Sequence, residues 1–186
     1  MNQALLVIDA QQELIDGNQE EKEVFNKERL IVNINHVIAQ ALVEDASVIF
    51  VRDKDVAEGE GNGFQVHKEI NIPEGKAVFF DKKATNAFYK TDLLPYLKDR
   101  SVSHLVIVGC KTEHCIDTAV RAATINGFDV TLVRDGHSTT DSNVLSAQEI
   151  IAHHNHTLHG HYNIDHFSVV RDADEPLFQP IHDQHR

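Results

Sequence analysis

Cysteines and basic residues are both scarce in this chain, and each shortage excludes a class of protein. The 186 residues include two cysteines, Cys110 and Cys115, which are too few for the disulfide framework of a small secreted domain. Seventeen Lys and Arg stand against 29 Asp and Glu, which gives a net charge of −12. Because this charge repels polyanions, we expect neither nucleic acid nor an anionic membrane as a partner.

Long apolar runs are also missing. The longest, such as residues 4–8 and 105–108, are far shorter than the roughly 20 residues that span a bilayer. The N-terminal stretch MNQALLVIDA has neither the basic segment nor the small-residue cleavage site of a signal peptide. With 41% hydrophobic residues, the chain can form one core. We therefore expect a single cytoplasmic domain, residues 1–186, that acts on a small molecule.

Short apolar runs alternate with helical patterns along the chain. Apolar residues at helical spacing within 30–42 and 116–123, and a capping box from Ser146 to Glu149, predict helices. Strands, buried on both faces, are predicted at residues 4–9, 47–51, 77–80, 104–109 and 129–133. This alternation is typical of a three-layer α/β/α fold with a doubly wound parallel sheet. Two segments do not follow it: residues 53–69, whose glycines predict a mobile loop, and the tail after Asp165.

Chemically versatile side chains follow three of the predicted strands, where ligands bind in an open parallel sheet. Asp9 ends the first strand, Lys82 follows the third, and Cys115 follows the fourth after a five-residue turn. We expect these three to converge at one edge of the sheet. From the residues alone other interpretations stay open: Asp9 as a turn former, Lys82 beside Lys83 as a solvated surface residue, and Cys115 as an inert buried thiol.

The turn from Gly109 to Cys115 leads directly into a predicted helix. Cys115 would then lie in the first helical turn, where unpaired backbone N–H groups and the helix dipole stabilise a thiolate. The same N–H groups can bind the negative charge that develops on a carbonyl oxygen during acyl transfer. Cys110 has no such setting, and we expect it to pack in the core.

Three motifs are spread along the chain between residues 9 and 123. They are Asp9-Ala-Gln11 with Leu14, then Lys82-Lys-Ala-Thr-Asn-Ala-Phe88, and finally Gly109-Cys-Lys-Thr-Glu-His-Cys115-Ile-Asp-Thr-Ala-Val-Arg-Ala-Ala123. The motifs resemble those of the isochorismatase-like superfamily, whose cysteine-hydrolase branch includes nicotinamidases and N-carbamoylsarcosine amidohydrolases. The resemblance implies a six-stranded parallel sheet and a catalytic triad of Asp9, Lys82 and Cys115, with Asp9 as general base and Cys115 as nucleophile.

Further features are implied by the resemblance. It places a cis peptide between Cys110 and Lys111, an oxyanion hole at the backbone N–H groups of Lys111 and Cys115, and a structural role at Asp135. The implied reaction is hydrolysis of the C–N bond of a small amide through a thioester, with no cofactor. Isochorismatase activity itself is not expected, because vinyl-ether hydrolysis in that branch does not use a cysteine nucleophile. The alternative is a catalytically silent scaffold or binding protein that keeps the fold.

Substrate-binding residues are expected in the first motif and among the aromatic residues near the strand ends. They are Gln11, Phe64, Phe88 and Tyr89. The aromatic members would line a flat pocket, although Phe88 equally fits a place in the core.

A catalytic metal is not expected. The nicotinamidase branch holds its metal through an Asp-x-His motif, and the matching residues here are Asp53-Lys-Asp55. Without that histidine, His67 and Asp53 make a poor zinc site.

The thirteen histidines of the chain still leave a metal-binding protein as a third interpretation. Many of them lie at 153–166, but only residues three or four apart share a helix face. His154 would share its face with Leu158, and most of the others would point to solvent. Since members of this superfamily commonly associate, we expect this helix and the tail 165–186 to help form a homo-oligomer.

Overall fold

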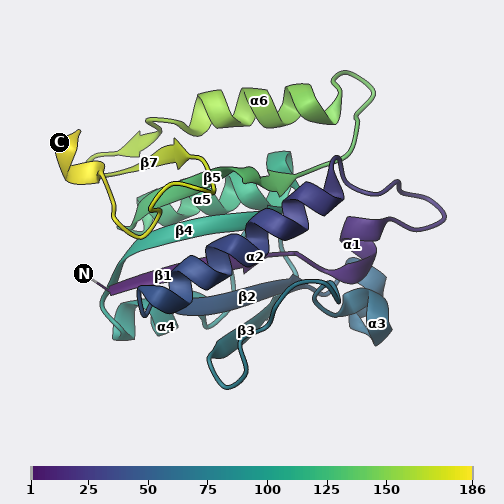
Figure 1. Cartoon of the computed structure of the whole chain (residues 1–186), viewed down its shortest axis with the longest axis horizontal. Coiled ribbons are helices and arrows are strands. Elements are labelled where there is room, and N and C mark those ends of the chain that lie inside the picture. The colour runs from purple at the N-terminus through teal and green to yellow at the C-terminus, as the bar shows by residue number, and fades with distance from the viewer. Residues whose placement is uncertain (1, 186) are drawn as a thin grey trace.

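A seven-stranded sheet organises residues 2–185, the part of the chain that the computed structural model describes (Figure 1). The order across the sheet is β3-β2-β1-β4-β5-β7-β6. Six strands are parallel, and the two-residue β6 pairs antiparallel with β7. The predicted parallel α/β sheet is therefore confirmed, with one short strand added. The strands are β1 (Asn2–Ile8), β2 (Ser47–Asp53), β3 (Ala77–Lys82), β4 (Val102–Cys110), β5 (Asp129–Ser138), β6 (Tyr162–Asn163) and β7 (His166–Arg171).

Helices cover both faces of the sheet (Figure 1). On one face lies α2 (Lys27–Val43), which buries apolar residues three and four positions apart against the strands. On the other face lie α4 (Leu93–Asp99) and α5 (Asp117–Ile125). Beside β5 and β7 lies α6 (Ala147–Leu158). Both bonds of the predicted capping box are present at its start, since the Ser146 side chain accepts from the Glu149 backbone and the Glu149 side chain accepts from Ser146.

Two expectations about individual segments were wrong. The strand β3 is not buried on both faces, and Phe79 is 40% exposed, because β3 is the edge strand and lies where the helix layers end. The tail after Asp165, which had no regular pattern, contains β7, whose Val169 and Val170 are buried beside β5. Within residues 2–185 no helix combines the length and the apolar character needed to cross a membrane.

Short helical turns occupy the connections at the carboxyl ends of the strands. After β1 comes α1 (Gln12–Asp16), and after β2 come η1 (Val56–Gly59) and α3 (Gly61–Phe64). After β4 comes η2 (Thr112–Ile116), and η3 (His182–Gln184) lies in the C-terminal tail. The first four of these turns surround the edge of the sheet at which Asp9, Lys82 and Cys115 are found.

Candidate active site

Asp9, Lys82 and Cys115 meet beyond the carboxyl ends of the strands. Asp9 follows β1, Lys82 ends β3, and Cys115 lies in η2, directly after β4. The Nζ atom of Lys82 lies 2.9 Å from Asp9 Oδ2 and 3.3 Å from Cys115 Sγ. The structure thus brings together the three residues that the sequence placed at one edge of the sheet.

Close approach of β1 and β4 sets the positions of Asp9 and of the nucleophile turn. Gly109 pairs with Ile8, and a Cβ atom at Gly109 would lie 1.9 Å from the Ile8 carbonyl oxygen. Glycine is therefore required at this point, where its φ is also 127°. The next peptide bond but one, between Cys110 and Lys111, is cis, at the position that the resemblance implied.

Cys115 itself lies in a wide helical turn. The backbone N–H of Ile116 donates to the carbonyl of Lys111, five residues earlier, over 3.2 Å, and such π-type turns are frequent at functional sites. The regular helix α5 begins only at Asp117. Cys115 is thus held at the entrance to a helix, close to the place that the sequence predicted.

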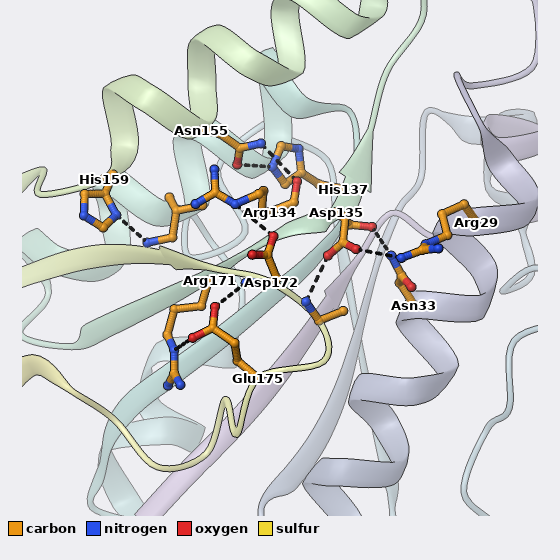
Figure 2. Close-up of polar contacts among 12 residues, drawn as sticks. Arg29, Asn33, Arg134, Asp135, His137, Asn155, His159, Arg171, Asp172 and Glu175 are labelled. Atoms are coloured by element: carbon orange, nitrogen blue, oxygen red, sulfur yellow. Dashed lines mark hydrogen bonds and ion pairs between the residues drawn. The ribbon is translucent and has the colours of Figure 1, made fainter.

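A buried histidine supports this turn from behind. Thr112 Oγ1 lies 2.8 Å from His137 Nδ1, and His137 Nε2 lies 3.0 Å from Asn155 Oδ1 (the His137–Asn155 bond is drawn in Figure 2). Because Asn155 Nδ2 donates to the Arg134 carbonyl, the amide oxygen faces the ring, so Nε2 carries the proton and Thr112 donates to Nδ1. Burial lowers the pKa of His137 to about 4, so the ring is neutral. No pattern in the sequence indicates this hydrogen-bond network.

Asp53 belongs to the same cluster and was not predicted as part of it. It ends β2, which lies between β1 and β3, and Lys82 Nζ donates a hydrogen bond to its Oδ2. Its backbone N–H donates to Gln11 Oε1 over 2.7 Å. Its position in the sequence does indicate a site, since Asp53, like Asp9, is a polar residue at a strand end. From the sequence it is considered only as a metal ligand.

Burial governs the protonation states of the cluster. It raises the pKa of Asp9 to about 6, although the charge of Lys82 opposes this shift. It likewise raises the pKa of the Cys115 thiol to about 12, and the Asp9 charge adds to the effect. Burial lowers the pKa of Lys82, but the charge of Asp9 and the hydrogen bonds to Asp53 and Asp9 outweigh this effect and keep the pKa above its usual value. At neutral pH the cluster therefore holds a carboxylate, an ammonium group and a thiol. Burial and the Asp9 charge thus oppose the stabilisation of a thiolate that is expected at a helix start.

The ammonium group of Lys82 also occupies the centre of a possible cation site. Asp9, Asp53 and Cys115 each offer a ligand atom, and these atoms lie within 4.8 Å of one another. Lys82 Nζ contacts all three residues, so a metal ion here would have to displace a buried lysine. His67 lies elsewhere, with its Nε2 3.2 Å from Asp16 Oδ1. These contacts do not fit the metal site of the nicotinamidase branch.

A cavity of about 330 Å³ opens over Cys115. Lys111 and Cys115, whose backbone N–H groups are the implied oxyanion donors, both contribute to its walls. The residues that line it are Asp9, Glu13, Leu14, Asn18, Glu21, Asp53, Asp55, Val56, Ala57, Lys111, His114 and Cys115. A cavity of this size fits a small substrate.

The four residues expected to bind substrate are not among those that line this cavity. The Gln11 amide is buried and bonds to the backbone of Asp53 and Phe64, over 2.7 to 3.0 Å. It therefore positions the end of β2 and does not line this cavity. The Phe64 ring is also buried, and the guanidinium carbon of Arg52 lies 4.4 Å from its centre.

The two remaining aromatic residues lie farther from the chemistry. Phe88 stacks against Phe128 in the core, with ring centres 6.3 Å apart, which is the alternative that the sequence left open. Tyr89 is 55% exposed and faces a different hollow, beside Lys54 and Lys90. The aromatic character of these two residues does not indicate, from the sequence, which surface each side chain contacts.

A larger groove, of about 630 Å³, lies between α2 and α6. Asp135 on its floor accepts hydrogen bonds from the Ala173 backbone over 2.9 Å and, through its carbonyl, from Asn33 over 2.7 Å (Figure 2). Arg29 reaches the same carboxylate over 3.5 Å. Asp135 thus joins α2 to the C-terminal segment, which supports the structural role implied for it. The lining of this groove includes no cysteine, so its size does not make it the catalytic site.

The histidine-rich segment forms the C-terminal half of α6 and the turn after it. Leu158 is buried, while His153, His156 and His159 are exposed. His154 Nδ1 lies 2.8 Å from the Ile150 carbonyl oxygen, within the same helix. The expected division between a buried face and solvent-facing histidines is confirmed, and the part of this helix in a homo-oligomer stays a prediction.

Known proteins share this arrangement of elements. Residues 3–155 match the model of the isochorismatase domain. The isochorismatase family protein YddQ of Bacillus subtilis is 28% identical, over 75% of this chain and 79% of its own. The crystal structure of a cysteine hydrolase from Pseudomonas syringae pv. phaseolicola has a TM-score of 0.82 at 18% identity, covering 95% of this chain and 91% of that one. N-carbamoylsarcosine amidase from Thermoplasma acidophilum has a TM-score of 0.72 at 20% identity, covering 94% and 98%. This chain therefore belongs to the isochorismatase family of hydrolases.

Proposed function

We propose that the protein hydrolyses the C–N bond of a small amide through a thioester on Cys115. One observation carries the proposal: the Lys82 ammonium lies 2.9 Å from the Asp9 carboxylate and 3.3 Å from the Cys115 sulfur, beside a cavity that all of Asp9, Asp53 and Cys115 line. A nucleophile with a base and an orienting charge in contact is the arrangement that covalent catalysis needs. The similarity in fold to a cysteine hydrolase and to an amidase supports this reaction class.

Asp9 acts first as a general base. Its carboxylate accepts the proton of the Cys115 thiol while the sulfur attacks the amide carbonyl, because a thiol with a pKa of about 12 holds little thiolate at neutral pH. Lys82 stabilises the negative charge on the sulfur as it forms. The backbone N–H groups of Lys111 and Cys115 receive the oxyanion. The C–N bond then breaks, and the amine leaves with the proton that Asp9 had accepted.

Hydrolysis of the thioester follows the same proton path. Asp9 removes a proton from a water molecule, whose oxygen attacks the thioester carbonyl. The C–S bond breaks, the acid leaves, and the Cys115 sulfur regains its proton from Asp9. The overall reaction consumes one water and releases one acid and one molecule of ammonia or small amine.

The direct test is ammonia release from a panel of small amides, with Cys115→Ala as the matched variant. We expect the wild type to release ammonia from some members and Cys115→Ala to match the protein-free blank. Thermal unfolding of both proteins shows that the variant is folded. Wild-type turnover by Cys115→Ala would contradict the proposal, and a folded wild type that cleaves no amide would favour the silent scaffold instead.

A further inference from the structure

Acidic side chains dominate the walls of the Cys115 cavity. Its carboxylates come from Asp9, Glu13, Glu21, Asp53 and Asp55. The basic groups at the cavity are the ammonium groups of Lys82 and Lys111 and the exposed ring of His114. Even with His114 protonated, carboxylates outnumber cations, so the potential inside the cavity is negative.

Each basic group of the cavity already has an acidic partner among the described residues. Lys82 contacts both Asp9 and Asp53, and Lys111 Nζ lies 2.6 Å from Glu21 Oε2. His114 Nε2 lies 3.7 Å from a carboxylate of Glu113. A substrate carboxylate entering the cavity would therefore have to break one of these pairs and would meet the remaining acids.

The acids at the cavity wall, by contrast, include groups without a cation. Within residues 2–185 neither Glu13 nor Asp55 forms an ion pair, and Glu13 Oε1 accepts only the amide hydrogen of Asn18, over 3.0 Å. Deeper in, the buried Asp9 carboxylate contacts Lys82 through Oδ2 and is close to the Cys115 thiol, while Oδ1 accepts no hydrogen bond within residues 2–185. A buried carboxylate that is not fully paired is costly, and because Asp9 lines the cavity, a donor group on a ligand can stabilise it.

We propose that the substrate of this site is a small amide that carries a positive charge, such as an ammonium or amidinium group, close to the scissile carbonyl. Glu13 and Asp55 receive this charge, while the carbonyl lies over Cys115. That the substrate is an amide rests on the proposed hydrolysis. That the substrate carries a positive charge rests on the charge of the cavity. The volume of about 330 Å³ limits the substrate to a small molecule.

A cationic substrate would also help to activate the nucleophile. Burial and the Asp9 charge hold the pKa of Cys115 high, and a positive charge nearby favours the thiolate. Binding of the correct substrate would thus make proton loss from the thiol easier. An anionic amide would have the opposite effect.

The first test measures the charge preference of Cys115 without any turnover. Methanethiosulfonate reagents form a mixed disulfide with a thiol and release methanesulfinate, and they exist as matched cationic (trimethylammonioethyl) and anionic (sulfonatoethyl) forms. We expect the cationic reagent to modify Cys115 about tenfold faster at low salt, relative to their rates with 2-mercaptoethanol, and this ratio to shrink as salt is added. Peptide mass spectrometry identifies which cysteine is modified. Cys110 should stay unmodified, because it is fully buried.

Charge-removing variants separate the cavity from the negative charge of the whole protein. Glu13→Gln with Asp55→Asn should lower the ratio of cationic to anionic rates severalfold. The matched control is Glu44→Gln, an exposed residue beyond the end of α2 and outside the cavity, which should leave the ratio unchanged. A ratio that the double variant does not alter, or faster modification by the anionic reagent, overturns the inference.

The second test uses three small primary amides that differ in charge: β-alaninamide, which is cationic, butyramide, which is neutral, and succinamate, which is anionic. We expect kcat/KM to fall in that order and the double variant to reduce the preference for the cationic amide. Hydrolysis with succinamate preferred would overturn the charge inference and leave amide hydrolysis standing. Cationic selectivity in the labelling test without hydrolysis of any amide would retain the charge inference and contradict the proposed reaction.

Discussion

Two hollows in this protein use their charged residues in opposite ways. In the groove between α2 and α6, which is the larger at about 630 Å³, Asp135 bonds to the backbone of the C-terminal segment and to Arg29. In the cavity over Cys115, of about 330 Å³, the buried carboxylate of Asp9 contacts the Lys82 ammonium and is close to the Cys115 thiol, and its Oδ1 accepts no hydrogen bond within residues 2–185. The first arrangement holds elements together, and the second leaves reactive groups available. In this protein the volume of a hollow thus indicates its function less well than the contacts that its charged side chains make.

The same substitution at the two aspartates gives the sharpest contrast. Asp9→Asn removes the proton acceptor, and we expect kcat/KM for the amide to fall about 10²–10⁴-fold, the range typical of general acid–base catalysis. Asp135→Asn keeps an oxygen that can accept from the Ala173 backbone, so its kcat/KM should stay within about twofold of wild type. Steady-state ammonia release measures both. A similar loss of kcat/KM in the two variants would contradict the assignment of catalysis to Asp9 and of a structural role to Asp135.

The pH profile tests the same contrast through titration. Asp9 must be ionised to act, and its pKa is raised to about 6, so kcat/KM should rise with pH below that value and level off above it. We expect activity roughly thirtyfold lower at pH 4.5 than at pH 7.5. The apparent value belongs to the coupled cluster of Asp9, Lys82 and Cys115. His137 at the groove is neutral throughout most of this range, with a pKa of about 4. A profile flat from pH 4.5 to 7.5 would exclude Asp9 as the base.

A substitution at Asp135 in the groove should lower the stability of the protein without changing its activity. Asp135→Ala leaves the Ala173 N–H without its acceptor, and Ala173 is buried. We expect the free energy of unfolding to fall by about 1–2 kcal/mol, with little added by loss of the exposed pair to Arg29. Urea unfolding measures this, and kcat/KM of the variant should be nearly unchanged. Unaltered stability would show that Asp135 does not join the two elements.

The two cysteines provide the smallest expected effect. Cys110 is fully buried, and burial raises the pKa of its thiol, so it behaves as a small apolar residue. Cys110→Ala should lose about 1 kcal/mol of stability and keep most of the activity. Urea unfolding and ammonia release check the two parts of this prediction. A large loss of activity would mean that the Cys110 side chain is needed to hold the turn that carries Cys115 in its active geometry.

Local patterns in the sequence were sufficient for most of the fold. Apolar runs predicted β1 to β5, because buried parallel strands need continuous apolar residues. The Ser146 capping box predicted the start of α6, because both of its bonds are local. The strand β7 escaped prediction, since it begins with His166 and is defined mainly by pairing with β5, far away in sequence.

The candidate site was predicted less completely, for a physical reason. Strand-end position identified Asp9, Lys82 and Cys115. The part played by Asp53 depends on the sheet order β3-β2-β1, which makes Lys82 reach across the end of β2, and no spacing in the sequence reports that order. His137 likewise acquires its place only when β5, α6 and η2 pack together. The high thiol pKa of Cys115 follows from burial, which a short motif does not reveal.

Trapping the thioester tests the central claim most directly. Wild-type protein mixed with a cleaved amide is quenched in acid within the first turnover, digested and analysed by mass spectrometry. We expect the acyl group of the substrate as added mass on the peptide that contains Cys115, released by hydroxylamine and missing from the Cys115→Ala protein. Hydrolysis of the amide at the wild-type rate with no acyl group on Cys115 at any quench time, together with full activity of Cys115→Ala, would contradict the account.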